Sequence, residues 1–355
     1  MGAEAADSTA DALVARLAGL PDVYPQKLDL AGQALLLVQL DLAGYRAASF
    51  LDDRILGPGT RGAWVALTRA AHASSAVSNA RPLHFIFHTG HVGSTLVSRL
   101  LDETGMVLSL REPLPLRTLA EAHDMLGQVD SLLSGADFEL LLSMFMRLWS
   151  RGYDATGSVV LKATSSTGRL ATKILARAES ARAIYMNLRA EPYLATLLAG
   201  QNSPADLRGH APERVRRLRL RAASPIAPLH SMSIGELAAL AWLVETFALQ
   251  DALAHVPARV IAVDFDDFLA DVAGSMHRII DHFGLEPGAR YLAEVARSPV
   301  LAHYSKAPEY AYTSDVRARV LRDSRQHNRE EIRKGLAWLK HLARVDPATA
   351  EILNV

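Results

Sequence analysis

Short apolar runs alternate with longer amphipathic segments from residue 84 onward. The apolar runs have the length and composition of buried strands, and they lie at 84–88, 106–110, 158–162, 183–188 and 259–263. The segments between them carry apolar residues at helical spacing, as Leu96, Val97, Leu100 and Leu101 do. We therefore predict an α/β fold with three layers (α/β/α), about five parallel strands in a central sheet, and a mainly helical C-terminal part.

The first 80 residues have a different pattern. They contain helical spacing and one strand-like run, at 10–20 and 64–72 for the helices and at 33–40 for the strand. A small and polar stretch, typical of a connector, follows them. The sequence therefore predicts an N-terminal helical or mixed subdomain at 1–80 and an α/β domain at 81–355.

Composition excludes several classes of function. Lys and Arg together number 38, as do Asp and Glu, so no global charge attracts the chain to nucleic acid or to an anionic membrane. Cysteine is absent, which excludes disulfides, thiolate nucleophiles and Cys-ligated zinc. The N-terminus lacks a basic segment before an apolar one, and the long apolar stretch at 234–256 contains acidic residues. We expect a cytoplasmic protein with neither a nucleic-acid nor a membrane partner.

The strongest local motif is the segment HFIFHTGHVGSTLVSRLL at 84–101. It has the order strand, glycine-containing turn, helix. Gly90 and Gly93 allow close approach of the backbone to a ligand, while Ser94 and Thr95 place N–H groups and hydroxyls at the start of the helix. This arrangement predicts a phosphate-binding loop. It is not a Walker A motif, because no Lys precedes Ser94, and a tight turn with no ligand remains the structural alternative.

This loop resembles that of the nucleotide-dependent sulfotransferases, a family with a P-loop-like fold that uses 3′-phosphoadenosine 5′-phosphosulfate (PAPS). The resemblance covers roughly 84–290 and is greatest for bacterial members with a Gly-Ser-Thr loop. It implies that the segment from Gly90 to Thr95 binds the 5′-phosphosulfate of PAPS. His91 occupies a position that is usually Lys or Arg in the family, and a protonated His91 could serve there.

Other segments resemble the family's binding site for the 3′-phosphate. In AIYMNLRAEPYLATLL at 183–198, Arg189 matches the family's arginine. The hydroxyl residue usually stands where Leu197 is found, and Thr196 lies one position short of it. Because the family often recruits a basic residue near the C-terminus to the 3′-phosphate, Lys306 is a further candidate.

Two residues that follow predicted strands are candidates for catalysis. Lys162 matches a family lysine that contacts the transferring sulfuryl group, and Thr164 stands where cytosolic members have their histidine base. Members without that histidine use a carboxylate near Glu112, and Pro113 should hold Glu112 in an extended conformation. The structural alternatives are a solvated Glu112 or one paired with Arg111, and a Lys162 that reaches solvent.

The histidines and the arginine-rich run have simpler interpretations. His84 and His88 lie on a predicted strand with no acidic residue between them, so the helical zinc pattern is absent and we expect no metal. The run RGHAPERVRRLRLR at 208–221 is typical of a solvated helix face. One or two of its arginines could instead reach phosphates or an acidic acceptor.

These features together predict a PAPS-dependent sulfotransferase that transfers a sulfuryl group to a hydroxyl or amine of a small-molecule or biopolymer acceptor. The predicted catalytic residues are Glu112, Lys162 and His91, and the predicted PAPS-binding residues are Gly90, Gly93, Ser94, Thr95, Arg189, Thr196 and Lys306. The acceptor pocket is expected at 1–80 and 114–150. The alternatives are a divergent P-loop phosphotransferase that requires magnesium and a nucleotide-binding protein without catalytic activity.

Overall fold

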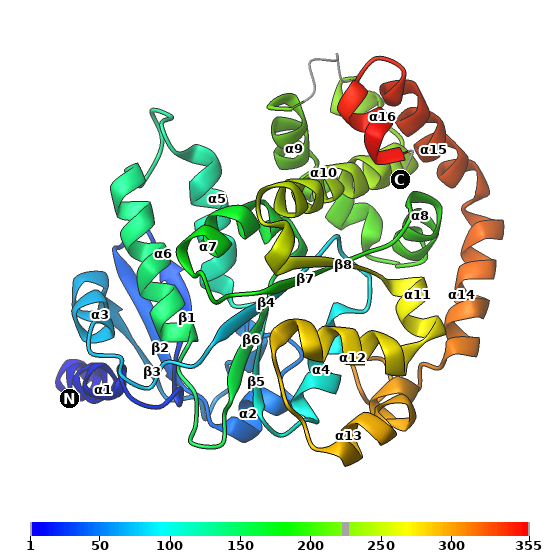
Figure 1. Ribbon diagram of the computed structural model, residues 1–355. Helices are drawn as coiled ribbons and strands as arrows, with labels where there is room; N and C mark the ends of the chain where they lie inside the picture. The colour runs from blue at the N-terminus through cyan, green and yellow to red at the C-terminus, as the bar shows by residue number, and fades with distance from the viewer. Residues whose placement is uncertain (1, 222–226, 354–355) are drawn as a thin grey trace.

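A five-stranded parallel sheet forms the centre of the protein (Figure 1). The computed structural model describes residues 2–221 and 227–353. The strands are β4 (Leu83–His88), β5 (Val107–Arg111), β6 (Ser158–Lys162), β7 (Ala183–Asn187) and β8 (Val260–Asp264). Their order in the sheet is β5-β6-β4-β7-β8. The central strand β4 therefore ends where the chain switches from one side of the sheet to the other, which is where such sheets bind ligands.

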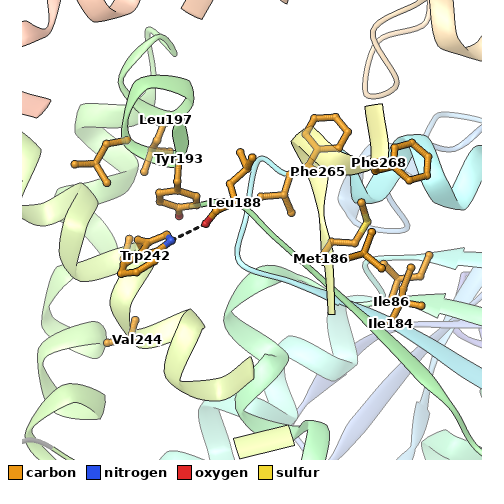
Figure 2. Packing of buried hydrophobic residues seen from close by; sticks show 14 of the residues in the cluster. Ile86, Ile184, Met186, Leu188, Tyr193, Leu197, Trp242, Val244, Phe265 and Phe268 are labelled. Carbon is orange, nitrogen blue, oxygen red and sulfur yellow. Dashed lines mark hydrogen bonds between the residues drawn. The ribbon is translucent and has the colours of Figure 1, made fainter. Parts of the chain in front are cut away.

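Helices cover both faces of this sheet, which confirms the predicted fold class. Alternate residues of β4 point to opposite faces. Ile86 packs in a hydrophobic cluster with α4 (Ser94–Asp102) and α12 (Val272–Phe283). Phe85 and Phe87 pack in a second cluster on the other face. That cluster includes residues of α5 (Leu114–Met125), α6 (Gly135–Trp149) and α7 (Ala171–Arg177). Figure 2 shows part of the first cluster, where Ile86, Ile184 and Met186 lie near Phe268.

The C-terminal part is helical, as predicted. Its long central helix is α10 (Ile234–His255), which contacts α8 (Ala190–Leu198), α9 (Ser203–Arg219), α15 (Arg329–Ala343) and α16 (Pro347–Leu353). The other helices of this part are α11 (Phe265–Ala270), α13 (Ala289–Glu294) and α14 (Ser314–His327). In the part of the chain that the structure describes, α10 alone is long and apolar enough to cross a membrane, and 78% of its apolar window is buried inside the protein. It is therefore a core helix of the fold, and the cytoplasmic location stays a prediction.

The N-terminal segment forms a three-stranded antiparallel sheet with three helices. Its elements are α1 (Gly2–Arg16), β1 (Val23–Asp29), β2 (Ala34–Gln39), α2 (Leu42–Ala47), β3 (Gly62–Ala66) and α3 (Leu67–Ser74). The helix predicted from Trp64 was wrong at its start, because Trp64 pairs with Leu36 in the sheet and the helix begins at Leu67. Strand β1 was missed, since it contains Pro25 and charged residues at its end. Side chains of this segment share the second hydrophobic cluster with Phe85. The boundary at residue 80 stays a prediction.

Candidate active site

The loop between β4 and α4 is held by His88, the last residue of the strand. Its ring Nδ1 accepts a hydrogen bond from the backbone N–H of Gly90 at 3.1 Å, and its Nε2 lies 2.8 Å from the carbonyl oxygen of Ala163. These partners assign the neutral tautomer with the proton on Nε2. Burial, followed by the charge of Lys162, lowers the pKa of His88 well below its usual value. His88 therefore supports the loop as a neutral side chain.

The backbone of this loop turns through left-handed conformations. Gly90 has φ +102° and Gly93 has φ +72°, and a Cβ atom at position 93 would lie 2.0 Å from the ring of Phe265. Only glycine fits this contact without displacing Phe265. His91 also has a positive φ, of 56°, which is uncommon for a residue with a side chain. Strained conformations of this kind concentrate at functional sites.

A cavity of about 330 Å³ lies beside the loop. It brings together predicted site residues that are far apart in the sequence, namely His91, Gly93, Ser94, Thr95, Thr196 and Lys306. Gly90, Arg189 and the predicted catalytic residues Glu112 and Lys162 are not among the described residues that line it. The cavity thus joins the loop, α8 and the segment before α14 in one binding site.

The polar groups at the base of this cavity fit a phosphate group. Ser94 and Thr95 form the first turn of α4, where backbone N–H groups have no partner within the helix. Thr95 Oγ1 is buried and has no hydrogen-bond partner among the described residues. Because an unpaired buried hydroxyl is costly, this atom is poised to bond a ligand oxygen. The residues present therefore fit the 5′ end of a nucleotide such as PAPS.

Thr196 and Leu197 differ in orientation. Leu197 is buried in the first hydrophobic cluster, whereas Thr196 lines the cavity and donates its hydroxyl hydrogen to the carbonyl of Pro192 at 2.7 Å. Figure 2 shows Leu197 close to Tyr193, with Trp242 hydrogen-bonded to the Leu188 carbonyl just before α8. Position 197 must be apolar here, and the hydroxyl that faces the cavity belongs to the preceding residue.

Arg189 lies at the N-cap of α8 with its side chain exposed to solvent. It does not line the cavity. The arginine that does so is Arg317 of α14, which forms an ion pair with Asp266 at 2.6 Å and lies 5.1 Å above the ring of Phe265. Arg317 was missed because nothing in the sequence around it marks a binding motif. It reaches the cavity only because α14 packs against α8.

Glu112 and Lys162 form an ion pair at the ends of adjacent strands β5 and β6. Lys162 is fully buried, which excludes the interpretation that its side chain reaches solvent. The expected extended conformation of Glu112 was wrong, because its φ is +55°. Its N–H donates to the carbonyl of Lys162 at 2.7 Å, which holds the residue close to the neighbouring strand. Arg111 is not the partner of Glu112, since it pairs with Asp102.

The buried ammonium group of Lys162 is tuned by its surroundings. Burial lowers the pKa of Lys162 to about 8, although the adjacent Glu112 carboxylate acts in the opposite direction. The positive charges of Lys306 and Arg111 lower the pKa further. Lys162 is therefore a cation at neutral pH that loses its proton in the mildly alkaline range, a property typical of functional sites.

Phe50 gathers three cations around its ring. The guanidinium carbon of Arg54 lies 3.6 Å from the ring centroid, the Nζ of Lys162 lies 5.7 Å from it, and the Nζ of Lys306 lies 5.9 Å from it. Through this ring the N-terminal segment contributes to the site. Sequence analysis missed Phe50, since it belongs to no motif and lies far from the loop in the chain.

His91 lines the cavity with its side chain exposed to solvent. Desolvation, followed by the charge of Lys306, lowers its pKa below the usual value. The role of a protonated His91 in place of a basic loop residue stays a prediction. From Thr89 to Thr95 the loop contains no Lys or Arg.

Another cavity, of about 280 Å³, is lined by no residue of the loop. It is bounded by α5, which follows Glu112, by the 3-10 helix Ser165–Leu170, which follows Lys162, and by α9. Its lining is polar and consists of Arg117, Glu121, Asp124, Met125, Ser166, Arg169, His210, Glu213 and Arg216. The 3-10 helix adjoins the loop, because a Cβ atom on Gly90 would lie 3.5 Å from Ser165 Cβ.

The arginine-rich run divides between solvent and buried pairs. Arg208, Arg216 and Arg219 are exposed, as predicted for a solvated helix face. Arg217 is largely buried and pairs with Glu245 at 2.6 Å, so it fixes α9 to α10. Exposed Arg216 lines the cavity between α5, the 3-10 helix and α9, and a ligand contact for this arginine stays a prediction.

The remaining histidine of the predicted strand has a packing role. His84 stacks on Phe283 with 5.1 Å between ring centroids, and its Nδ1 accepts the N–H of Arg182. Among the residues described, no cluster of three or more histidine and acidic side chains has the arrangement of a metal site.

No protein-family model matches the sequence, and no curated protein matches it. Among solved structures the matches include sulfotransferases. Sulfotransferase STF1 from Mycobacterium tuberculosis is 15% identical, with a TM-score of 0.41, over 75% of this chain and 82% of that chain. The sulfotransferase from Alicyclobacillus acidocaldarius is 14% identical, with a TM-score of 0.39, over 73% and 99%. Mouse sulfotransferase SULT7A1, in complex with PAP, is 10% identical, with a TM-score of 0.38, over 76% and 88%.

Proposed function

We propose that the protein is a sulfotransferase that moves a sulfuryl group from PAPS to a hydroxyl or amine. One observation carries this proposal: the phosphate-binding loop, with the unpaired buried hydroxyl of Thr95, shares its cavity with Lys306, which flanks the same aromatic ring as the buried Lys162. Transfer of an anionic group requires a site that binds the donor's phosphate and a charge that stabilises the leaving group. A phosphate site next to a buried cation that is paired with a carboxylate provides both.

The donor nucleotide would occupy the cavity beside the loop. Backbone N–H groups at the start of α4 and the hydroxyls of Ser94 and Thr95 would hold its 5′-phosphosulfate. Phe265, Tyr304 and Tyr312 supply aromatic surface for an adenine ring in the same cavity. Thr196 and Arg317 also line it and are available to a 3′-phosphate.

The transfer step would use Glu112 and Lys162 together. The acceptor oxygen or nitrogen forms a bond to sulfur while the bond between sulfur and the bridging phosphate oxygen breaks, and PAP leaves with the electron pair. Lys162 would stabilise negative charge on the departing oxygen. Lys162 donates a hydrogen bond to Oε1 of Glu112, and the Glu112 side chain is 18% exposed. Its Oε2 is thus available to take the proton of the acceptor.

The second cavity would bind the acceptor. It lies along the helices that directly follow Glu112 and Lys162, and the 3-10 helix on its wall adjoins the loop of the donor site. Ionisable side chains dominate its lining, with Ser166 as the one hydroxyl and Met125 as the one aliphatic side chain. Such a surface favours an acceptor rich in hydrogen-bonding groups over a flat apolar phenol.

A thermal-shift panel tests the nucleotide assignment. PAP, ATP with magnesium, GTP with magnesium and NAD are compared, each at about 100 times its dissociation constant, where a ligand adds roughly 2.7 kcal/mol to stability. We expect PAP to stabilise the protein without metal. Stabilisation only by ATP with magnesium would favour the phosphotransferase. If PAP binds but PAPS is not turned over with any polyol, saccharide, amine or phenol, the nucleotide-binding protein without activity is favoured.

A further inference from the structure

The phosphate loop of this protein contains no cation of its own. A phosphosulfate group carries negative charge on both its phosphate and its sulfate. Loops that bind such groups at a helix N-terminus commonly add a lysine to the backbone N–H groups. This loop has no Lys or Arg from Thr89 to Thr95, and its one basic side chain is His91, whose pKa is lowered. A positive charge must therefore come from elsewhere in the chain if the group is to be held without water.

Lys306 is the cation that the fold brings to the loop. It lines the cavity beside the loop together with His91, Ser94 and Thr95, although more than 200 residues separate it from them in the sequence. It is partly buried, and none of the ion pairs among the described residues involves it. Its charge also reaches Lys162, whose pKa it lowers. An unpaired ammonium between the loop and the buried lysine is suited to an anionic ligand.

Arg99 fixes this position of Lys306. It lies on α4, the helix that begins at the loop, and its Nε donates to the carbonyl of Ser305 at 2.8 Å. Its Nη2 donates to the hydroxyl of Ser49 at 2.8 Å, immediately before Phe50. One side chain therefore ties the neighbours of Lys306 and Phe50 to the same helix. The 5.9 Å contact between Lys306 and the Phe50 ring follows from this anchoring.

We propose that Lys306 supplies the cation of the phosphate loop and binds the 5′-phosphosulfate end of the donor. The sequence resemblance implied a 3′-phosphate partner for Lys306, and the new assignment places it at the opposite end of the nucleotide. The inference rests on the proposed function, since it assumes that a nucleotide 5′-phosphate enters the loop. It also predicts that a lysine introduced into the loop can take over the role.

Calorimetric binding of three nucleotides tests this assignment. Adenosine 5′-phosphate, adenosine 3′-phosphate and PAP are titrated into the wild type and into Lys306→Met. In Lys306→Met, loss of a charge-assisted contact should lower the affinity for adenosine 5′-phosphate and for PAP by roughly 10- to 100-fold. The affinity for adenosine 3′-phosphate should be unchanged. The exposed Lys340→Met serves as the matched control, since it removes one lysine charge far from the loop in α15. Lys306→Gln provides a second variant if the first does not fold.

A rescue variant sharpens the test. His91→Lys in the Lys306→Met background should restore most of the affinity for adenosine 5′-phosphate, because position 91 lines the same cavity. If only the affinity for adenosine 3′-phosphate falls, Lys306 binds the 3′-phosphate instead. If the affinities for both monophosphates fall equally and His91→Lys does not restore them, Lys306 has a general role. Either result overturns the assignment. If the wild type binds none of the three nucleotides, the proposed function itself fails, and the assignment of Lys306 fails with it.

Discussion

Glu112 and Lys162 end two adjacent parallel strands and form an ion pair in which the lysine is wholly buried and the carboxylate is in part exposed. The pair differs from both structural alternatives, in which Glu112 would be solvated or bound to Arg111. Breaking such a pair leaves an uncompensated buried charge, so its two members cannot be treated as independent. Each therefore has two possible roles: a direct one in the reaction, and an indirect one through its partner.

The pH dependence of the rate should report Lys162. Burial lowers its pKa to about 8, so the ammonium is present below that pH and is lost as the pH rises through it. We expect kcat to fall above about pH 8 if this charge stabilises the leaving group. In Glu112→Gln the carboxylate that raises the pKa of Lys162 is gone, so the fall should move to lower pH. A profile flat to pH 9.5 in the wild type would contradict a role for the Lys162 cation.

The identity of the base can be tested by exchanging carboxylate for amide. Glu112→Gln should keep PAP affinity but lose turnover by roughly 10²- to 10⁴-fold if Glu112 accepts the acceptor proton. If Glu112 acts only by keeping Lys162 protonated, the loss of turnover in Glu112→Gln should be smaller at pH 6, where Lys162 stays protonated. His91→Gln is the comparison for the competing base. Near-full activity in Glu112→Gln, with a collapse in rate but not in binding in His91→Gln, would reverse the assignment.

The sequence predicts the sheet and the loop well because both depend on local patterns. The five strands occur within one residue of their expected bounds, and the Gly90-to-Thr95 turn has the left-handed conformations that its glycines suggest. The N-terminal sheet was harder to predict, because Trp64 lies in a strand only through pairing with Leu36. Tertiary pairing of this kind overrides local propensity.

The site was predictable only where a motif marked it. Ser94, Thr95 and Lys162 are marked by their positions at the ends of elements. Phe50 and Arg317 come from segments with no motif, and packing brings them to the site. The lowered pKa of His91 was also beyond the sequence, because it results from desolvation by the protein around the ring and from the charge of Lys306.

The contact between Gly93 and Phe265 can be tested with a matched pair of glycine variants. Gly93→Ala places a Cβ atom 2.0 Å from the Phe265 ring at φ +72°, so we expect loss of PAP binding together with lower stability. Gly105 has nearly the same φ, +74°, and a Cβ atom there meets no other atom within 4 Å. Gly105→Ala should therefore cost only the backbone strain, about 1–2 kcal/mol, and keep PAP affinity. Equal behaviour of the two variants in calorimetry and thermal unfolding would show that the Phe265 contact is unimportant.

The binding site for the 3′-phosphate can be assigned by comparing two arginines with two ligands. PAP carries a 3′-phosphate and adenosine 5′-phosphosulfate does not, so a true partner of that group affects PAP alone. The sequence predicts such a selective loss for Arg189→Ala, of about 1.5–3 kcal/mol. The structure leads us to expect a larger selective loss in Arg317→Met, because Arg317 lines the cavity with Thr196 whereas Arg189 is exposed at the start of α8. Asp266 loses its partner in Arg317→Met, so thermal unfolding must show an intact fold before affinities are compared. A selective loss confined to Arg189→Ala would favour the sequence-based assignment, and equal losses for both ligands would show that the substituted arginine is structural.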